Sequence, residues 1–156
     1  MSIEARLKEE GYHLPHAAAP VANYVGAVRT GHLVIVSGQL CFDHHGKLSP
    51  EFKGKLGAGI ELETGQQAAR LCALNILAQV KALTGSLESI QRCVRLGGFI
   101  NATPDYDQLP QVMNGASDFM VLALGDKGRH ARSTIGVAQL PMDACVEVEA
   151  IFEITA

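Results

Sequence analysis

The chain has 156 residues, the size of one ordinary domain, and we expect a single domain over residues 1–156. With 47% hydrophobic and 19% charged residues it can bury a core, which excludes a disordered chain. The net charge of -3 excludes an overall field that attracts RNA or DNA, so nucleic acid is not an expected partner. The start of the chain lacks the apolar segment of a signal peptide, and no stretch is apolar enough to cross a membrane. We therefore predict a soluble, cytoplasmic protein.

Four cysteines, Cys41, Cys72, Cys93 and Cys145, are scattered along the chain. No pair has the short spacing of a zinc site or a redox motif, so we expect four buried, reduced thiols. The run Asp43-His44-His45 could be part of a metal site, but neighbouring residues signal no third ligand. We interpret it as a solvated turn, so the residues alone predict no metal site.

The first third of the chain contains a predicted helix, a connector and a predicted strand. Residues 2–10 alternate charged and apolar residues and predict a short amphipathic helix that ends at Gly11. Residues 15–22 predict an extended connector, because two prolines resist helix there. The apolar run 33–36 predicts a strand that ends at Ser37-Gly38. Because glycine permits close contacts, we expect this backbone to approach another group closely.

The middle of the chain alternates between helix and strand patterns. The predicted elements are a hairpin turn at 43–47, a glycine-rich loop at 48–60, a long amphipathic helix at 63–83, a buried strand at 92–100, a turn at 101–105 and a second helix at 107–124. Residues 125–130 read as a helix exit and a solvated turn.

Two strands end the chain. The second, residues 146–154, places Val146, Val148, Ala150, Phe152 and Ile154 on one face and Glu147, Glu149, Ile151 and Glu153 on the other. The first face is expected to pack on helices, while the second must meet water, another subunit or a ligand. The order of elements predicts an α+β domain, in which one sheet carries two helices on one face.

Arg132 lies two residues before the apolar run Thr134 to Ala138, at the start of a predicted strand. A guanidinium cannot lose its proton, so at this position it needs an anion. The anion is either a structural partner, Glu147 or Glu149, or the carboxylate of a ligand held by a bidentate fork. The residues alone leave both alternatives open. Ser37 is not expected to be a nucleophile, because Ser37-Gly38-Gln39 lacks the flanking pattern of a nucleophile elbow.

Three ordered blocks of sequence carry a family resemblance. The blocks are GHLVIVSGQL at 31–40, ARS at 131–133 and LPMDACVEVEA at 140–150. Together they resemble the RidA/YjgF reactive-intermediate deaminase family over residues 20–154. The third block, with the preceding ARS, is specific, whereas SGQ alone is weak.

The resemblance implies a chorismate-mutase-like α+β fold with a single mixed sheet and a homotrimer with clefts between subunits. It implies hydrolysis of reactive enamines and imines, such as 2-aminoacrylate, to a keto acid and ammonia without a cofactor. Arg132 would hold the substrate carboxylate, and Glu147 would handle water. The other substrate-binding positions implied are Tyr24, Ser37, Gly38, Asn114 and Thr134.

The chain also departs from the family pattern. Thr134 and His130 replace residues that are often cysteine and proline, and residues 1–18 form an N-terminal extension that we expect to cover the cleft. These features are typical of a divergent, longer-chain branch. The alternative function is binding of a small carboxylate in the same cleft without turnover. A third, less favoured function is that of an endoribonuclease or translation inhibitor, against which the negative charge counts.

Overall fold

The computed structural model describes all residues, 1–156, and centres on a five-stranded mixed sheet with the strand order β1-β2-β7-β5-β6. The strands are β1 (Ala27–Thr30), β2 (Leu33–Leu40), β5 (Ile90–Asn101), β6 (Ala131–Val137) and β7 (Val146–Ile154). Only β5 and β6 run parallel, while the other neighbours are antiparallel. Two very short strands, β3 (Lys55–Leu56) and β4 (Gly59–Ile60), form a separate pair.

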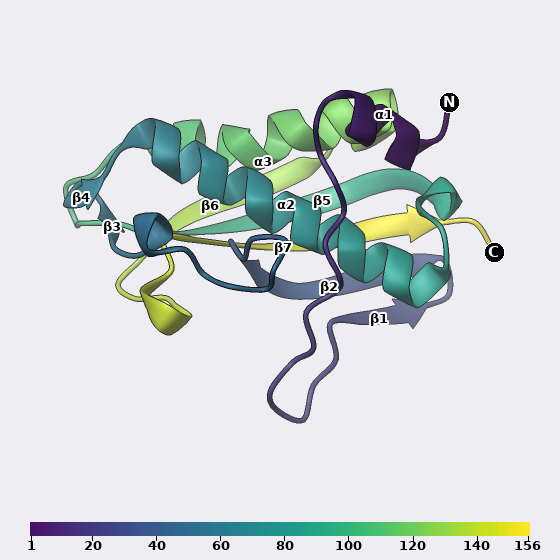
Figure 1. Cartoon of the computed structure of the whole chain (residues 1–156), viewed down its shortest axis with the longest axis horizontal. Helices are drawn as coiled ribbons and strands as arrows, with labels where there is room; N and C mark the ends of the chain where they lie inside the picture. The colour runs from purple at the N-terminus through teal and green to yellow at the C-terminus, as the bar shows by residue number, and fades with distance from the viewer.

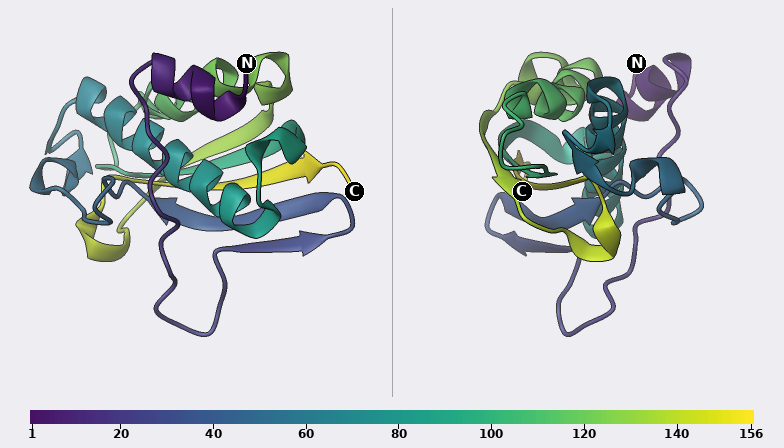
Figure 2. Two further views of the ribbon diagram at one scale, coloured as in Figure 1. Left: turned by 45° about the vertical axis from the view of Figure 1, so that its right-hand side comes forward. Right: turned by 90° about the vertical axis from the view of Figure 1, so that its left-hand side faces the viewer.

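Helices cover only one face of this sheet (Figures 1 and 2). The helices α2 (Leu62–Thr84) and α3 (Leu109–Leu124) lie side by side on that face, as predicted, and the opposite face is open. A third, short helix, α1 (Ile3–Glu9), packs beside α3, where Arg6 Nη1 donates to the carbonyl of Ala123 at 3.1 Å. Each of the three helices is too short or too polar to span a bilayer.

The alternation of β7 sets which face is buried. Its five apolar residues, Val146, Val148, Ala150, Phe152 and Ile154, are at most 2% exposed and contact the helices, as the pattern predicted. They belong to one core of 37 buried residues that extends across both helices and the sheet. Glu147 and Glu149 consequently project from the open face.

The long helices begin and end near their predicted limits. Gly85 ends α2 in a left-handed conformation, with φ of 86°, and its N–H donates to the carbonyl of Lys81. Ser2 caps α1 by accepting from the backbone N–H of Ala5. In the contact between α2 and α3, a side chain on Gly115 would overlap the carbonyl of Gln66, so the close approach of the helices depends on glycine.

Three loop predictions need correction. The turn at 43–47 forms, because Asp43 Oδ1 accepts from the N–H groups of His45 and Lys47, but it joins no two strands, since a side-chain turn needs no strand partner. The strand predicted to end at Ser37-Gly38 continues to Leu40 through a bulge. The loop at 48–60 contains β3 and β4, which are too short to show periodicity in sequence.

All four cysteines are buried and free, as expected. Three of them, Cys41, Cys72 and Cys145, lie together beneath the first residues of β7, where Cys72 Sγ donates to the carbonyl of Val146 at 3.5 Å. Burial raises the pKa of the Cys72 thiol well above its ordinary value. Their wide spacing in sequence gave no sign of this cluster.

Candidate functional site

Glu147 projects from the open face of the sheet near the start of β7. Its neighbour on that face, Glu149, pairs with Arg95 at 3.4 Å, whereas Glu147 forms no ion pair. Burial raises the pKa of the Glu147 carboxyl above its ordinary value, and repulsion from Glu149 adds a smaller effect in the same direction. A carboxyl in this state can exchange a proton near neutral pH more readily than an ordinary glutamate.

The bulge in β2 lies directly against this carboxylate. The register between β2 and β7 shifts between Val36 and Gln39, so Ser37 and Gly38 together lie opposite one residue of β7, Glu149. A Cβ at Gly38 would lie 2.5 Å from Glu147 Oε2. The prediction that the Ser37-Gly38 backbone closely approaches another group is therefore confirmed, and that group is the Glu147 carboxylate.

Glu147 lines a cleft of about 280 Å³. Gly38 and the half-exposed Tyr24 share this cleft, so three of the residues implied by the resemblance come together. Ser37 lies beside it, and its hydroxyl donates to the carbonyl of Val25 at 2.7 Å. Ser37 thus fixes the segment that carries Tyr24, and its hydroxyl is engaged with the backbone.

Arg132 lies on the other side of the sheet, at the β6 edge. Its guanidinium donates to Asn114 Oδ1 at 2.9 Å, to Ser117 Oγ at 3.0 Å and to the carbonyl of Pro110 at 3.2 Å. All three acceptors belong to α3 and all are neutral. The positive charge is oriented by this arrangement but not compensated, so a place for an external anion is left.

His130 extends the support of Arg132. Its Nδ1 lies 2.6 Å from the carbonyl of Gly128, and its Nε2 lies 2.8 Å from Ser117 Oγ. The consistent assignment has Nδ1–H donating to Gly128, Nε2 accepting from the Ser117 hydroxyl, and Ser117 Oγ accepting from Arg132. The histidine that departs from the family pattern therefore positions Arg132 through Ser117.

Thr134 follows Arg132 on the same face of β6. Its hydroxyl oxygen is buried and makes no hydrogen bond. Its substrate-binding role stays a prediction.

The implied residues thus form two separate groups in one chain. Glu147 lies on the open face, whereas Arg132 contacts α3 on the helical side, and β5 separates β7 from β6. The expectation that Arg132 lies near Glu147 or Glu149 is wrong within one chain, because strands adjacent in sequence are not neighbours in this sheet. An ion pair with either glutamate is absent.

Sequence reasoning missed two contributors to these groups. Ser117 follows Asn114 by three residues, and this helical spacing was a signal that both could face Arg132. Met142 lines the cleft with Glu147. Its backbone is left-handed, with φ of 58°, but the sequence gave no sign of this turn because the residue is not a glycine.

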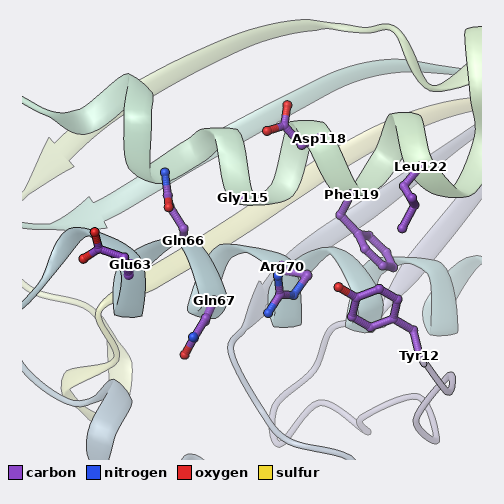
Figure 3. A pocket seen from close by; sticks show the side chains of 9 residues that line it. All are labelled: Tyr12, Glu63, Gln66, Gln67, Arg70, Gly115, Asp118, Phe119 and Leu122. Carbon is purple, nitrogen blue, oxygen red and sulfur yellow. The ribbon is translucent and has the colours of Figure 1, made fainter. Parts of the chain in front are cut away.

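A larger cavity of about 400 Å³ lies elsewhere, between α2 and α3 (Figure 3). Tyr12, Arg70 and Phe119 meet at one end of it, with the Arg70 guanidinium 5.5 Å from the centre of the Tyr12 ring. It contains none of the implied site residues. Across the chain, no three His, Cys, Asp or Glu side chains are grouped to hold a metal ion.

The chain is similar in sequence to a known protein family and to one of its relatives. Residues 4–154 match the family model described as "YjgF/chorismate_mutase-like, putative endoribonuclease". The chain is 43% identical over 153 residues to Protein TCP17 of Trypanosoma cruzi, which covers 97% of this chain and 94% of that protein.

Two solved structures are also similar. Atu1372 of Agrobacterium tumefaciens, a protein of unknown function, is 46% identical with a TM-score of 0.90, and the match covers 98% of this chain and 92% of that one. TdcF of E. coli, solved with bound serine, shares the fold at 24% identity with a TM-score of 0.65, over 90% and 94% of the two chains. The mixed sheet with helices on one face is thus the chorismate-mutase-like fold, and the chain belongs to the RidA/YjgF family.

Proposed function

We propose that this protein hydrolyses reactive enamine and imine intermediates of amino acids, such as 2-aminoacrylate, to a keto acid and ammonia. The reaction takes place in clefts between the subunits of a homotrimer. The observation that carries this proposal is the oriented but uncompensated guanidinium of Arg132, whose three acceptors are all neutral. A two-oxygen anion such as the substrate carboxylate completes its coordination.

Glu147 supplies the acid–base chemistry in this proposal. A water molecule adds to the carbon of the C=N bond of the protonated imine. Glu147 takes one proton from that water, and the hydroxyl group stays on the carbon. Glu147 then returns the proton to the amino nitrogen, and the carbon–nitrogen bond breaks. Ammonia leaves and takes the hydroxyl proton, so the products are ammonium and the keto acid. The raised pKa of Glu147 suits a group that accepts and returns a proton in one cycle.

A second subunit is part of the proposal, because Arg132 and Glu147 lie on opposite sides of the sheet. The open face offers a surface for assembly: the exposed apolar residues Val28, Leu33, Ile35 and Ile135 lie there around the pair formed by Arg95 and Glu149. Apolar patches with a polar element are typical of subunit interfaces.

The test is release of ammonia and pyruvate from 2-aminoacrylate, generated in situ by a PLP-dependent dehydratase. We expect the wild type to accelerate release, and Arg132→Ala to lower kcat/KM by at least about 100-fold, because a bidentate contact to the reacting molecule is lost. Arg129→Ala is the matched control: it removes an exposed arginine three positions earlier and should retain activity.

Equal release with and without the wild-type protein contradicts hydrolysis of this imine. In that case, thermal stabilisation by pyruvate that is lost in Arg132→Ala would favour the alternative function, binding of a carboxylate without turnover. RNA binding that weakens steeply with salt would instead favour the nuclease function.

A further inference from the structure

One wall of the cleft that contains Glu147 is apolar and comes from the N-terminal connector and from the loop before β7. Four residues of the N-terminal connector, Ala18, Ala19, Pro20 and Val21, line the cleft; we call them the strap. The connector crosses the outer side of α2 and continues as a loop that projects beyond the sheet at β1 (Figures 1 and 2). Met142, from the loop before β7, lines the same cleft.

Buried amides fix the strap in place. Gln79 of α2 is 6% exposed, and its Nε2 donates to the carbonyl of Ala18 at 2.8 Å and to Gln39 Oε1 at 3.4 Å. Gly26 leaves the space that the Gln79 amide occupies, since a side chain there would overlap it. A buried amide is costly to leave without partners, so this contact holds the strap against β2.

The far end of the same segment is also tethered. Ser37 donates through its hydroxyl to the carbonyl of Val25 and through its N–H to the carbonyl of Gly26 at 2.9 Å. The strap therefore lies between two anchored points, Ala18 and Val25. Its position beside Glu147 is a built feature of the fold.

Met142 is presented from a strained turn. Met142 and Asp143 both have left-handed backbones, with φ of 58° and 59°. Asp143 is held by the Asn101 amide, which donates to its carboxylate at 3.2 Å, and by its own carbonyl, which accepts from Gly54 N–H at 2.9 Å. Met142, by contrast, is 57% exposed at the cleft. A flexible thioether in this place adapts to an apolar ligand.

The side chains of the strap and of Met142 carry no charge and no hydrogen-bond donor. A three-carbon imine would place its carboxylate and its reacting carbon near the polar groups and leave this wall unused. From this we infer that the strap and Met142 form an apolar subsite for the side chain of the substrate. The preferred substrates are then imino acids with an aliphatic side chain about the size of that of leucine. The inference rests on the proposed function.

The test compares the imines made by an L-amino-acid oxidase, with catalase, from leucine and from alanine. We expect the wild-type kcat/KM to be at least about tenfold higher for the leucine-derived imine, because three more carbons are buried. Val21→Ser and Met142→Ser should each reduce this ratio by about fivefold or more. Both residues are exposed, so both variants should fold.

Two further variants isolate the cause. Met142→Gly removes the side chain and relieves the left-handed backbone, and it should reduce the ratio as Met142→Ser does. Leu83→Ser, at an exposed position outside the cleft, should leave the ratio unchanged.

The outcomes separate this inference from the proposed function. Hydrolysis of both imines with equal kcat/KM overturns the subsite and leaves the function standing. If neither imine is hydrolysed, the function fails, and calorimetric binding of 4-methyl-2-oxopentanoate against pyruvate decides the subsite. Tighter binding of the larger keto acid that is lost in Met142→Ser supports it, and equal affinities overturn it.

Discussion

Glu147 and Gly38 depend on each other at the scale of single residues. The glycine leaves room for the carboxylate, which in turn is half-buried and unpaired beside Glu149. Burial disfavours the charged form, so the folded protein binds the Glu147 proton more tightly than the unfolded chain does. The free energy of unfolding therefore falls as the pH rises from the ordinary carboxyl pKa of 4.5 through the raised folded value, and it is constant above it.

Glu147→Gln should remove this pH dependence. At pH values above the raised pKa the variant should have a higher Tm than the wild type, because the cost of burying a charge is gone. Below the unfolded pKa the two should melt together, since both side chains are then neutral. Calorimetry at about pH 3.5 and pH 7.5 measures the difference, with Glu153→Gln as the same substitution at an exposed position of β7. A lower Tm of Glu147→Gln at the higher pH would contradict the prediction.

The residue-level predictions succeeded where a side chain was out of place in its pattern. Arg132 stood out as a charge in an apolar strand, and Gly38 as a glycine after one. The pattern did not show that the guanidinium points to Asn114 and Ser117. The alternation of a strand separates two faces, but it does not indicate which helix packs on either face.

At the scale of elements, α2 and α3 pack in close contact. Gly115 of α3 lies against the backbone carbonyl of Gln66 in α2, so the backbones of the two helices meet with no side chain between them. Helical spacing predicted both elements and nearly their limits, since each has an apolar stripe at three- and four-residue steps. It could not reveal the glycine contact, because a missing side chain leaves no mark on hydrophobic periodicity.

Gly115→Ala should destabilise the protein by about 2–3 kcal/mol, because the new methyl group forces the helices apart by more than the better helix propensity of alanine recovers. Urea unfolding gives the difference. Gln111→Ala, at an exposed position one turn earlier, keeps the backbone carbonyl that Gln66 contacts and should be nearly neutral. Equal stability of Gly115→Ala and the wild type would mean that the two helices can separate without cost.

At the scale of the whole molecule, strand order decides what one chain can do alone. β7 pairs with both β2 and β5, so β6 is displaced to the edge and Arg132 is separated from Glu147. The amino-acid sequence indicated four of these strands, all but β1, and it did not indicate their order, because pairing between strands far apart in the chain leaves no local pattern. The helices then cover one face and leave the glutamates on the other, so a site that uses both residues requires two chains.

This division predicts that two inactive variants restore each other. Arg132→Ala and Glu147→Gln should each lack deaminase activity as pure oligomers. In the proposed trimer, chains co-expressed in equal amounts mix at random, and about a quarter of the interfaces then join an intact Arg132 from one chain to an intact Glu147 from its neighbour. Activity per site should therefore recover to about a quarter of the wild-type value, measured as ammonia release from 2-aminoacrylate.

A mixture of the two variants purified separately and combined without exchange should stay inactive, which controls for the sum of residual activities. If the co-expressed mixed trimers are equally inactive, Arg132 and Glu147 must act from the same chain. The sheet would then have to rearrange to bring its two faces to one site, which the pairing of β7 with β5 along the length of β5 opposes. Recovery is the outcome that this fold favours, since it requires only that the open face of one chain meet the β6 edge of the next.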